Sequence, residues 1–203
     1  MESSQSVINS SKIDRRIRRT KEAISSAFLQ LLKEKDIAKI TVKELCEKAD
    51  INRKTFYTYY SNASSVLTEI ENDIIKQFKD SVTSIKTRKA ILDIADIFVC
   101  IEGLLNIHLK FINQLVRADA LSSLQNKIKT TIKEAIFEVM LNDNQYNNKI
   151  LSLTLEYIVS GVVSIYINWF YSKDTIALSE LSKLANQFVF SNTQIALAFS
   201  QSK

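Results

Sequence analysis

The chain contains no proline and only two glycines, Gly103 and Gly161, among its 203 residues. Hairpin turns in β-sheet proteins normally use glycine where the backbone needs a positive φ. Glycine-rich phosphate loops, dinucleotide-binding fingerprints and the nucleophile elbow of hydrolases need glycines at spacings that this sequence lacks. Because 46% of the residues are apolar, there is ample material for a core. We therefore expect an all-α protein whose helices are joined by short turns.

Positive charge is concentrated near the start of the chain. The formal net charge is +5, and residues 1–60 carry this whole surplus, with 13 basic and 8 acidic side chains. A local basic cluster on an otherwise balanced protein suggests a polyanionic partner such as nucleic acid. A solvated charged helix face is the alternative interpretation. The densest part of the cluster comprises Lys12, Arg15, Arg16, Arg18 and Arg19.

Other side chains do not suggest metal binding or catalysis. Cys46 and Cys100 are the only cysteines, and His108 is the only histidine. Because zinc sites need a denser cluster, we expect reduced thiols, no metal and no cofactor. No pair of carboxylates and no serine–histidine arrangement suggests acid–base or nucleophilic chemistry, so we do not expect an enzyme.

No segment of the sequence predicts export or a membrane span. Residues 1–11 are polar and serine-rich, unlike a signal peptide. The uncharged stretch at residues 157–172 is short for a membrane span and contains Ser160, Ser164 and Asn168. We therefore expect a cytoplasmic protein that does not contact the membrane.

Hydrophobic periodicity predicts three helices between residues 15 and 60, after a disordered segment over residues 1–14. The first helix starts near Arg19 or Thr20. Thr41 and Glu44 form a capping-box pattern that opens the second. Asn52 is a good N-cap for a short third helix, from residue 53 to about residue 59. Longer helices are expected at 63–78, 88–103, 107–118, 120–141, 149–172 and 176–200, with a loop at 142–148.

The two short helices and their three-residue turn, residues 50–52, match the helix-turn-helix pattern. In this motif the start of the second helix enters the major groove and contacts bases. Asn52, Arg53, Lys54 and Thr55 occupy that start, and an arginine can bind a guanine with two hydrogen bonds. An ordinary helical hairpin with a polar outer face is the alternative interpretation.

The stretch from Arg19 to Leu67 resembles the DNA-binding domain of TetR/AcrR-type transcriptional regulators. It covers about a quarter of the chain. The matching elements are the apolar run at 28–32, the Thr-Val start at 41–42, the turn at 49–52, the Thr-Phe-Tyr sequence at 55–57 and the aromatic pair at 59–60.

The resemblance implies a role for individual side chains. Thr41, Tyr57 and Tyr59 would contact phosphates, while Phe56 and Tyr60 would pack inward. The basic arm, from Arg15 to Arg19, would follow the DNA backbone or enter the minor groove. The DNA-binding residues implied in this way, together with the helix-turn-helix pattern, are Arg15, Arg16, Arg18, Arg19, Thr41, Asn52, Arg53, Lys54, Thr55, Tyr57 and Tyr59.

The sequence departs from the family pattern at two positions. Asp50 stands where the family usually has glycine, and aspartate tolerates the positive φ expected there at a modest cost. Ala63 stands where the family usually has a phosphate-binding lysine, and an alanine side chain cannot make that contact.

The resemblance also implies a domain organisation and partners. Residues 15–62 would bind a pseudo-palindromic DNA operator, and residues 63–203 would form a dimerisation and effector domain. The last two helices, about 149–172 and 176–200, would form a four-helix bundle in a homodimer, with Gly161 allowing close helix approach. Their burial within the monomer is the alternative.

Repression is the commoner mode in the family, with release of the operator by a small-molecule effector. The alternative is a co-activator that acts through a protein partner. Aromatic residues are candidates to line an effector cavity, but a core stripe predicts the same positions, so the effector-binding residues remain unknown. These candidates are Phe98, Phe111, Tyr157 and Trp169.

Overall fold

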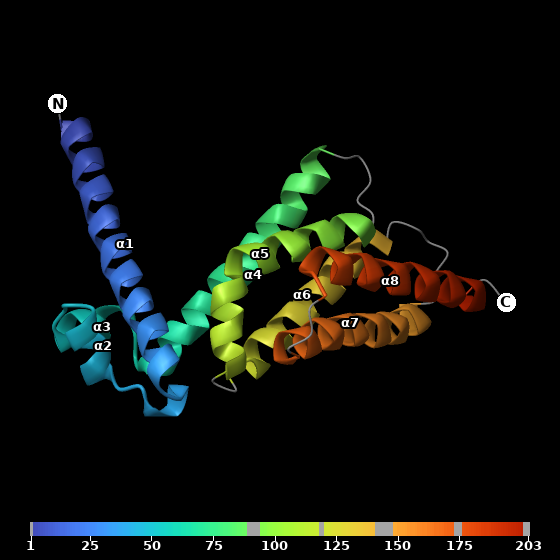
Figure 1. The fold of residues 1–203 in the computed structure, drawn as a ribbon. Helices are drawn as coiled ribbons and strands as arrows, with labels where there is room; N and C mark the ends of the chain where they lie inside the picture. Colours follow the sequence, from blue (N-terminus) through green and yellow to red (C-terminus); the bar gives the residue numbers. More distant parts are fainter. Residues whose placement is uncertain (1, 89–93, 118–119, 141–147, 173–175, 201–203) are drawn as a thin grey trace. The chain divides into compact units, whose positions relative to one another are not determined.

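The computed structural model describes residues 2–88, 94–117, 120–140, 148–172 and 176–200 (Figure 1). These residues form eight α-helices and a short 3₁₀ helix, and none of them is in a β-strand. The all-α prediction is therefore confirmed. The helices are α1 (Glu2–Glu34), η1 (Ile37–Lys39), α2 (Val42–Lys48), α3 (Arg53–Tyr59), α4 (Ala63–Arg88), α5 (Ile94–Arg117), α6 (Ser122–Met140), α7 (Asn148–Tyr171) and α8 (Leu178–Ser200).

The chain divides into two compact units. The first comprises residues 1–72 and 117–120, and the second comprises residues 73–116 and 121–203. The division falls within α4, ten residues after the boundary at 62/63 that we expected from the sequence. The assignment of a function to each part of the chain remains a prediction.

In the first unit, α1 contacts α2 and α2 contacts α3 (Figure 1). Each helix places apolar side chains in a shared core because these residues recur at helical spacing. Among the most completely buried are Ile24 and Phe28 of α1, Leu45 of α2, Phe56 of α3 and Val66 of α4.

Helix α1 begins at Glu2, whereas the sequence predicted a disordered segment over residues 1–14. The segment contains neither proline nor glycine, the residues that most often stop a helix. Its polar side chains are compatible with a helix, so the helix continues towards the N-terminus beyond the apolar pattern that predicted it.

In the second unit, α7 packs against both α6 and α8. Tyr166 of α7 donates a hydrogen bond to Ser182 of α8 at 3.1 Å in a buried position. Burial is the main reason why the pKa of Tyr166 is raised. The segment Ser152–Tyr171 is long and apolar enough to cross a membrane, but the interior helix of a globular protein has the same properties.

Two helices of this unit differ from the sequence prediction. The predicted break between residues 103 and 107 is wrong, since α5 runs without interruption through Gly103. One glycine within a helix costs only about 1 kcal/mol, which the buried face of a 24-residue helix outweighs. Helix α4 extends to Arg88 rather than residue 78. The loop predicted at 142–148 lies outside the described residues except for Asn148.

Candidate nucleic-acid interface

Thr41 and Glu44 form a complete capping box at the start of α2. The carboxylate oxygen Oε2 of Glu44 accepts hydrogen bonds from the backbone N–H of Thr41 at 3.1 Å and from its hydroxyl at 2.8 Å. In return, the backbone N–H of Glu44 donates to Oγ1 of Thr41 at 3.3 Å. The predicted N-terminus of α2 is therefore confirmed in atomic detail.

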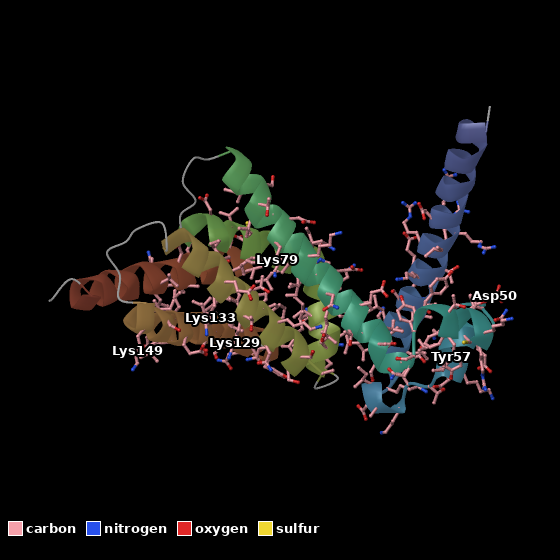
Figure 2. The ribbon with its side chains drawn as sticks, turned by 180° about the vertical axis from the view of Figure 1, so that it is seen from behind. Asp50, Tyr57, Lys79, Lys129, Lys133 and Lys149 are labelled. Atoms are coloured by element: carbon pink, nitrogen blue, oxygen red, sulfur yellow. The ribbon has the colours of Figure 1, made fainter. Side chains whose placement is uncertain are left out.

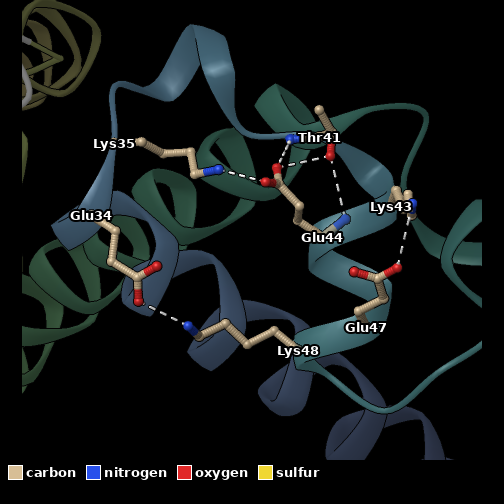
Figure 3. A network of polar contacts seen from close by, with 7 residues as sticks. All are labelled: Glu34, Lys35, Thr41, Lys43, Glu44, Glu47 and Lys48. Atoms are coloured by element: carbon tan, nitrogen blue, oxygen red, sulfur yellow. Dashed lines mark hydrogen bonds and ion pairs between the residues drawn. The ribbon is translucent and has the colours of Figure 1, made fainter.

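Two ion pairs connect the end of α1 to α2 (Figure 3). The Nζ of Lys35 lies 2.5 Å from Oε1 of Glu44, and the Nζ of Lys48 lies 2.9 Å from Oε1 of Glu34. The hydrogen bond from Lys35, followed by those from Thr41, lowers the pKa of Glu44 from its ordinary value of 4.5 to about 2. Glu44 is therefore a carboxylate at neutral pH.

The turn between α2 and α3 is a Schellman motif. Asp50 has a φ of 52°, in the left-handed region, as the sequence analysis expected. The N–H of Ile51 donates to the carbonyl of Cys46 at 3.0 Å, and the N–H of Asp50 makes a longer bond of 3.4 Å to Glu47. These bonds satisfy carbonyls at the end of α2 and reverse the chain direction before α3.

Helix α3 is held in place by one capping residue and by aromatic side chains. The side-chain oxygen of Asn52 accepts a hydrogen bond from the N–H of Thr55 at 2.7 Å. Phe56 and Tyr60 are both buried, as predicted. The Nζ of Lys21 lies 5.8 Å from the centre of the Tyr60 ring and 2.7 Å from Glu69 of α4. These contacts connect α1, α3 and α4 within the first unit.

The polar residues predicted to bind DNA remain on the outside of α3. Asn52, Arg53 and Lys54 are exposed, and Tyr57 exposes 58% of its surface. Thr55 and Tyr59 are partly exposed. Figure 2 shows Tyr57 and Asp50 among the side chains that surround α2 and α3. Hydrogen-bonding groups therefore lie at the start of a short, well-anchored helix.

The basic arm forms part of α1. The four arginines at positions 15, 16, 18 and 19 are exposed, and Thr41 at the start of α2 is exposed as well. Arg18 lies 3.4 Å from Glu22 one helical turn later. Because such an exposed pair is weak, it leaves Arg18 able to change partner.

Ala63 at the start of α4 is buried and exposes only 9% of its surface. The start of this helix is satisfied locally, because the N–H of Ser65 donates to the side-chain oxygen of Asn62 at 2.9 Å. The alanine offers no group for a phosphate, so any basic contact has to come from another position.

The second unit contains a small apolar cavity of about 50 Å³. Of the four aromatic residues proposed for an effector cavity, the three whose side chains are described do not line it. Tyr157 exposes 71% of its surface, Phe111 is buried elsewhere, Trp169 donates to the carbonyl of Ile176 at 2.8 Å, and the side chain of Phe98 lies outside the described residues. The cavity walls include Ile101, Leu105, Leu124, Ile132, Val163 and Tyr166.

No group of three His, Cys, Asp or Glu side chains that could hold a metal ion occurs among the described residues. Cys46 and Cys100 are both buried free thiols, and burial raises the pKa of each. Nε2 of His108 donates a hydrogen bond to Oε1 of Gln77 at 3.0 Å, and burial lowers the pKa of His108.

Sequence reasoning missed the cations that organise this surface. Lys21 contacts Glu69, which lies 48 positions further along the chain, and no local sequence pattern predicts such a pair. Lys35 lies nine positions before Glu44. Its position at the end of the first helix, just before a capping-box glutamate, was the only available signal.

Comparisons with known proteins agree with this geometry. No protein-family profile matches the sequence. Over 57 residues, 28% of the chain, it is 47% identical to the uncharacterized HTH-type transcriptional regulator YxbF of Bacillus subtilis. The match spans only 15% of the length of that relative.

Solved structures match much more of the chain. A TetR transcriptional regulator from Streptococcus agalactiae superposes with a TM-score of 0.65 at 21% identity, over 89% of this chain and 98% of that one. The chain has the fold of the TetR-family transcriptional regulators. The dihydroxyacetone kinase operon activator DhaS shares the TetR-like fold, with a TM-score of 0.60 at 18% identity over 87% of this chain and 96% of that one.

The described helices can be assigned to parts of the TetR-like fold. Helices α2 and α3 with the Schellman turn form the helix-turn-helix, which agrees with the resemblance of residues 19–67. Among the described residues, all the regular secondary structure of the second unit is helical.

Proposed function

We propose that the chain is a DNA-binding transcriptional regulator that uses α3 to read an operator. The observation that carries this proposal is the start of α3, where Asn52, Arg53 and Lys54 are exposed while Phe56 anchors the helix in the core. Arg53 and Lys54 would contact bases or adjacent phosphates in the major groove. This role requires neither a cofactor nor catalysis, and it is consistent with a cytoplasmic location.

Phosphate contacts would hold α3 in register. Thr41, Tyr57 and Tyr59 each carry a hydroxyl at or near the surface of the first unit. The exposed arginines 15, 16, 18 and 19 add four positive charges on α1. Contacts of this kind fix orientation on the duplex without reading its sequence. They also make affinity fall steeply as salt increases.

A homodimer would bring two copies of α3 to two half-sites of a pseudo-palindrome. The outer surfaces of α7 and α8 support this proposal because they expose large apolar side chains that soluble monomers normally cover. Space is open beside Gly161, where no atom of the described residues lies within 4 Å of where a Cβ would be, so a partner helix would have room to approach. The exposed residues are Leu153, Tyr157, Tyr171, Leu184 and Phe188.

Repression that is relieved by a small-molecule effector is the mode we propose. Ligand pockets for drug-sized molecules have volumes of roughly 300–1,000 Å³. Because the apolar cavity has a volume of about 50 Å³, an effector of that size would have to open it. An apolar effector would thereby couple its binding to a change in the second unit.

The second candidate function is a co-activator that works through a protein partner. It is favoured by one comparison, because a structure with the same fold is named as an operon activator. Such a protein would use the same dimer but would show no selective binding to DNA on its own.

Fluorescence anisotropy tests the proposed function. The purified protein is titrated against the duplex that flanks its own gene and against a scrambled duplex, each at two salt concentrations. We expect tight binding to the flanking duplex that weakens with salt. Equal binding to both duplexes at both salt concentrations would instead favour the co-activator.

A further inference from the structure

The start of α2 carries a negative charge at the place where the proposed function requires a DNA phosphate to bind. The hydroxyl of Thr41 has one proton, and it donates that proton to Glu44 at 2.8 Å. Glu44 is ionised, so an incoming phosphate would meet a carboxylate at the same helix start. Two anions this close repel one another unless a cation lies between or beside them.

Lys35 is the cation at this position. Its Nζ contacts Oε1 of Glu44, the carboxylate oxygen that Thr41 does not use. Only 27% of the Lys35 side chain is exposed, so the pair is less screened by water than an ordinary surface pair. The Lys35 ammonium therefore neutralises Glu44 from the side away from the Thr41 hydroxyl (Figure 3).

Three other lysines of this region form ion pairs of their own. Lys48 pairs with Glu34 at 2.9 Å, Lys39 with Asp36 at 3.0 Å, and Lys43 approaches Glu47 at 3.9 Å. Each of these pairs joins groups other than Glu44. Removal of the Lys35 ammonium consequently takes away the counter-charge of Glu44 and leaves those pairs in place.

We propose that Lys35 is a positioning residue for DNA binding, which neutralises Glu44 so that a DNA phosphate can approach Thr41. This inference rests on the proposed function. On binding, the hydroxyl of Thr41 turns from Oε2 of Glu44 to a phosphate oxygen. Lys35 keeps its bond to Oε1, and the backbone N–H of Glu44 continues to donate to Thr41. Lys35 acts through Glu44 and does not itself touch DNA.

The test is a double-mutant cycle measured by anisotropy on the duplex that the wild-type protein prefers. Lys35→Met should weaken binding about five- to tenfold, the effect expected when a partly screened carboxylate near a phosphate loses its counter-charge. Lys35→Arg should bind within about twofold of wild type because it retains the cation. In a Glu44→Gln background, Lys35→Met should change affinity by less than about twofold.

Lys48→Met is the matched control, since it breaks the other ion pair between α1 and α2 without altering Glu44. It should bind within about twofold of wild type. The loss caused by Lys35→Met should also shrink as salt rises, which a packing defect would not do. Thermal unfolding of each variant shows whether it is folded, and the Lys35→Arg and double variants decide the question if Lys35→Met unfolds.

Two results would overturn the inference. One is wild-type affinity in Lys35→Met. The other is an equal loss with and without Glu44→Gln, which would mean that Lys35 contacts DNA directly. Absence of selective binding by the wild-type protein would instead overturn the proposed function, so the two failures are distinguishable.

Discussion

The side-chain oxygen of Asn52 lies 2.7 Å from the backbone nitrogen of Thr55 and accepts its hydrogen. One of the otherwise unpaired amides at the start of α3 is thereby satisfied. The exposed side chains of Arg53 and Lys54 stand between these two residues. The hydrogen bond between Asn52 and Thr55 therefore fixes the backbone of Arg53 and Lys54.

Replacing Asn52 tests its structural role as the N-cap of α3. Asn52→Ala should lower the free energy of unfolding by about 1 kcal/mol, because the N–H of Thr55 loses its acceptor. Asn52→Ser should retain most of the stability, since serine also caps helices. Urea unfolding followed by circular dichroism measures both. A stability of Asn52→Ala equal to that of wild type would show that the cap contributes nothing.

The left-handed conformation of Asp50 gives a second prediction. Asp50→Ala should lower the free energy of unfolding by about 1 kcal/mol, because a Cβ without a compensating polar group is strained at positive φ. Asp50→Gly should stay within about 0.5 kcal/mol of wild type, since glycine adopts this φ freely but gains entropy when unfolded. Thermal denaturation of this matched pair checks the turn, and the reverse order of stabilities would contradict it.

Base reading and phosphate binding should respond differently to mutation. Arg53→Ala should cost roughly 1–3 kcal/mol of binding free energy on the preferred duplex and relax specificity there. Tyr57→Phe should weaken binding to all duplexes more evenly, because a phosphate contact carries no sequence information. Competition anisotropy with single-base variants of the duplex compares the two. If both variants bound like wild type, the proposed docking of α3 would be wrong.

The exposed apolar surface of α8 predicts the oligomeric state. Phe188 exposes 54% of its surface, and Phe188→Asp should place a charge in the proposed dimer interface and shift the protein towards monomer. Gln187→Glu adds the same charge one residue earlier, at a polar exposed position, and serves as the control. Sedimentation velocity at several concentrations measures the shift. A dimer that persists in Phe188→Asp would place the interface elsewhere.

The lowered pKa of Glu44 predicts that the stability of the folded protein depends on pH in the acid range. Because the folded state favours the carboxylate, its contribution is complete above the ordinary pKa of 4.5 and is lost as the pH falls towards 2. Glu44→Gln should therefore lose less stability than wild type over this range. Urea midpoints at the two ends of the range measure the difference.

Glu47→Gln is the control for that experiment, since Glu47 has only a 3.9 Å contact with Lys43. An identical loss of stability in wild type and Glu44→Gln would show that the capping box does not depend on the charge of Glu44.

Local features of the helix-turn-helix could be predicted from the sequence. The capping box of Thr41, the cap of Asn52 and the turn at Asp50 each depend on residues within a few positions of one another. Short-range backbone chemistry leaves few alternatives for such sequences. The outward position of Arg53 and the burial of Phe56 follow from the same helical period.

Features that depend on packing could not be predicted in this way. The pair between Lys21 and Glu69 requires two helices to meet, and their approach is set by the core rather than by either residue. The predicted break after Gly103 failed because propensity is a weak signal beside the burial of a long apolar face. The cavity is lined mainly by aliphatic side chains, whose pattern is that of any helical core.

The length of α3 has a statistical consequence. Its seven residues form a helix about 10 Å long, which faces about three base pairs at a spacing of about 3.4 Å. With four distinguishable base pairs, a three-letter word recurs by chance on the order of once in 64 positions. Two such words at a fixed separation recur on the order of once in 4,000 positions. In the proposed dimer, the fixed separation of the two copies of α3 would therefore contribute as much to the selection of one chromosomal site as the side chains that contact the bases.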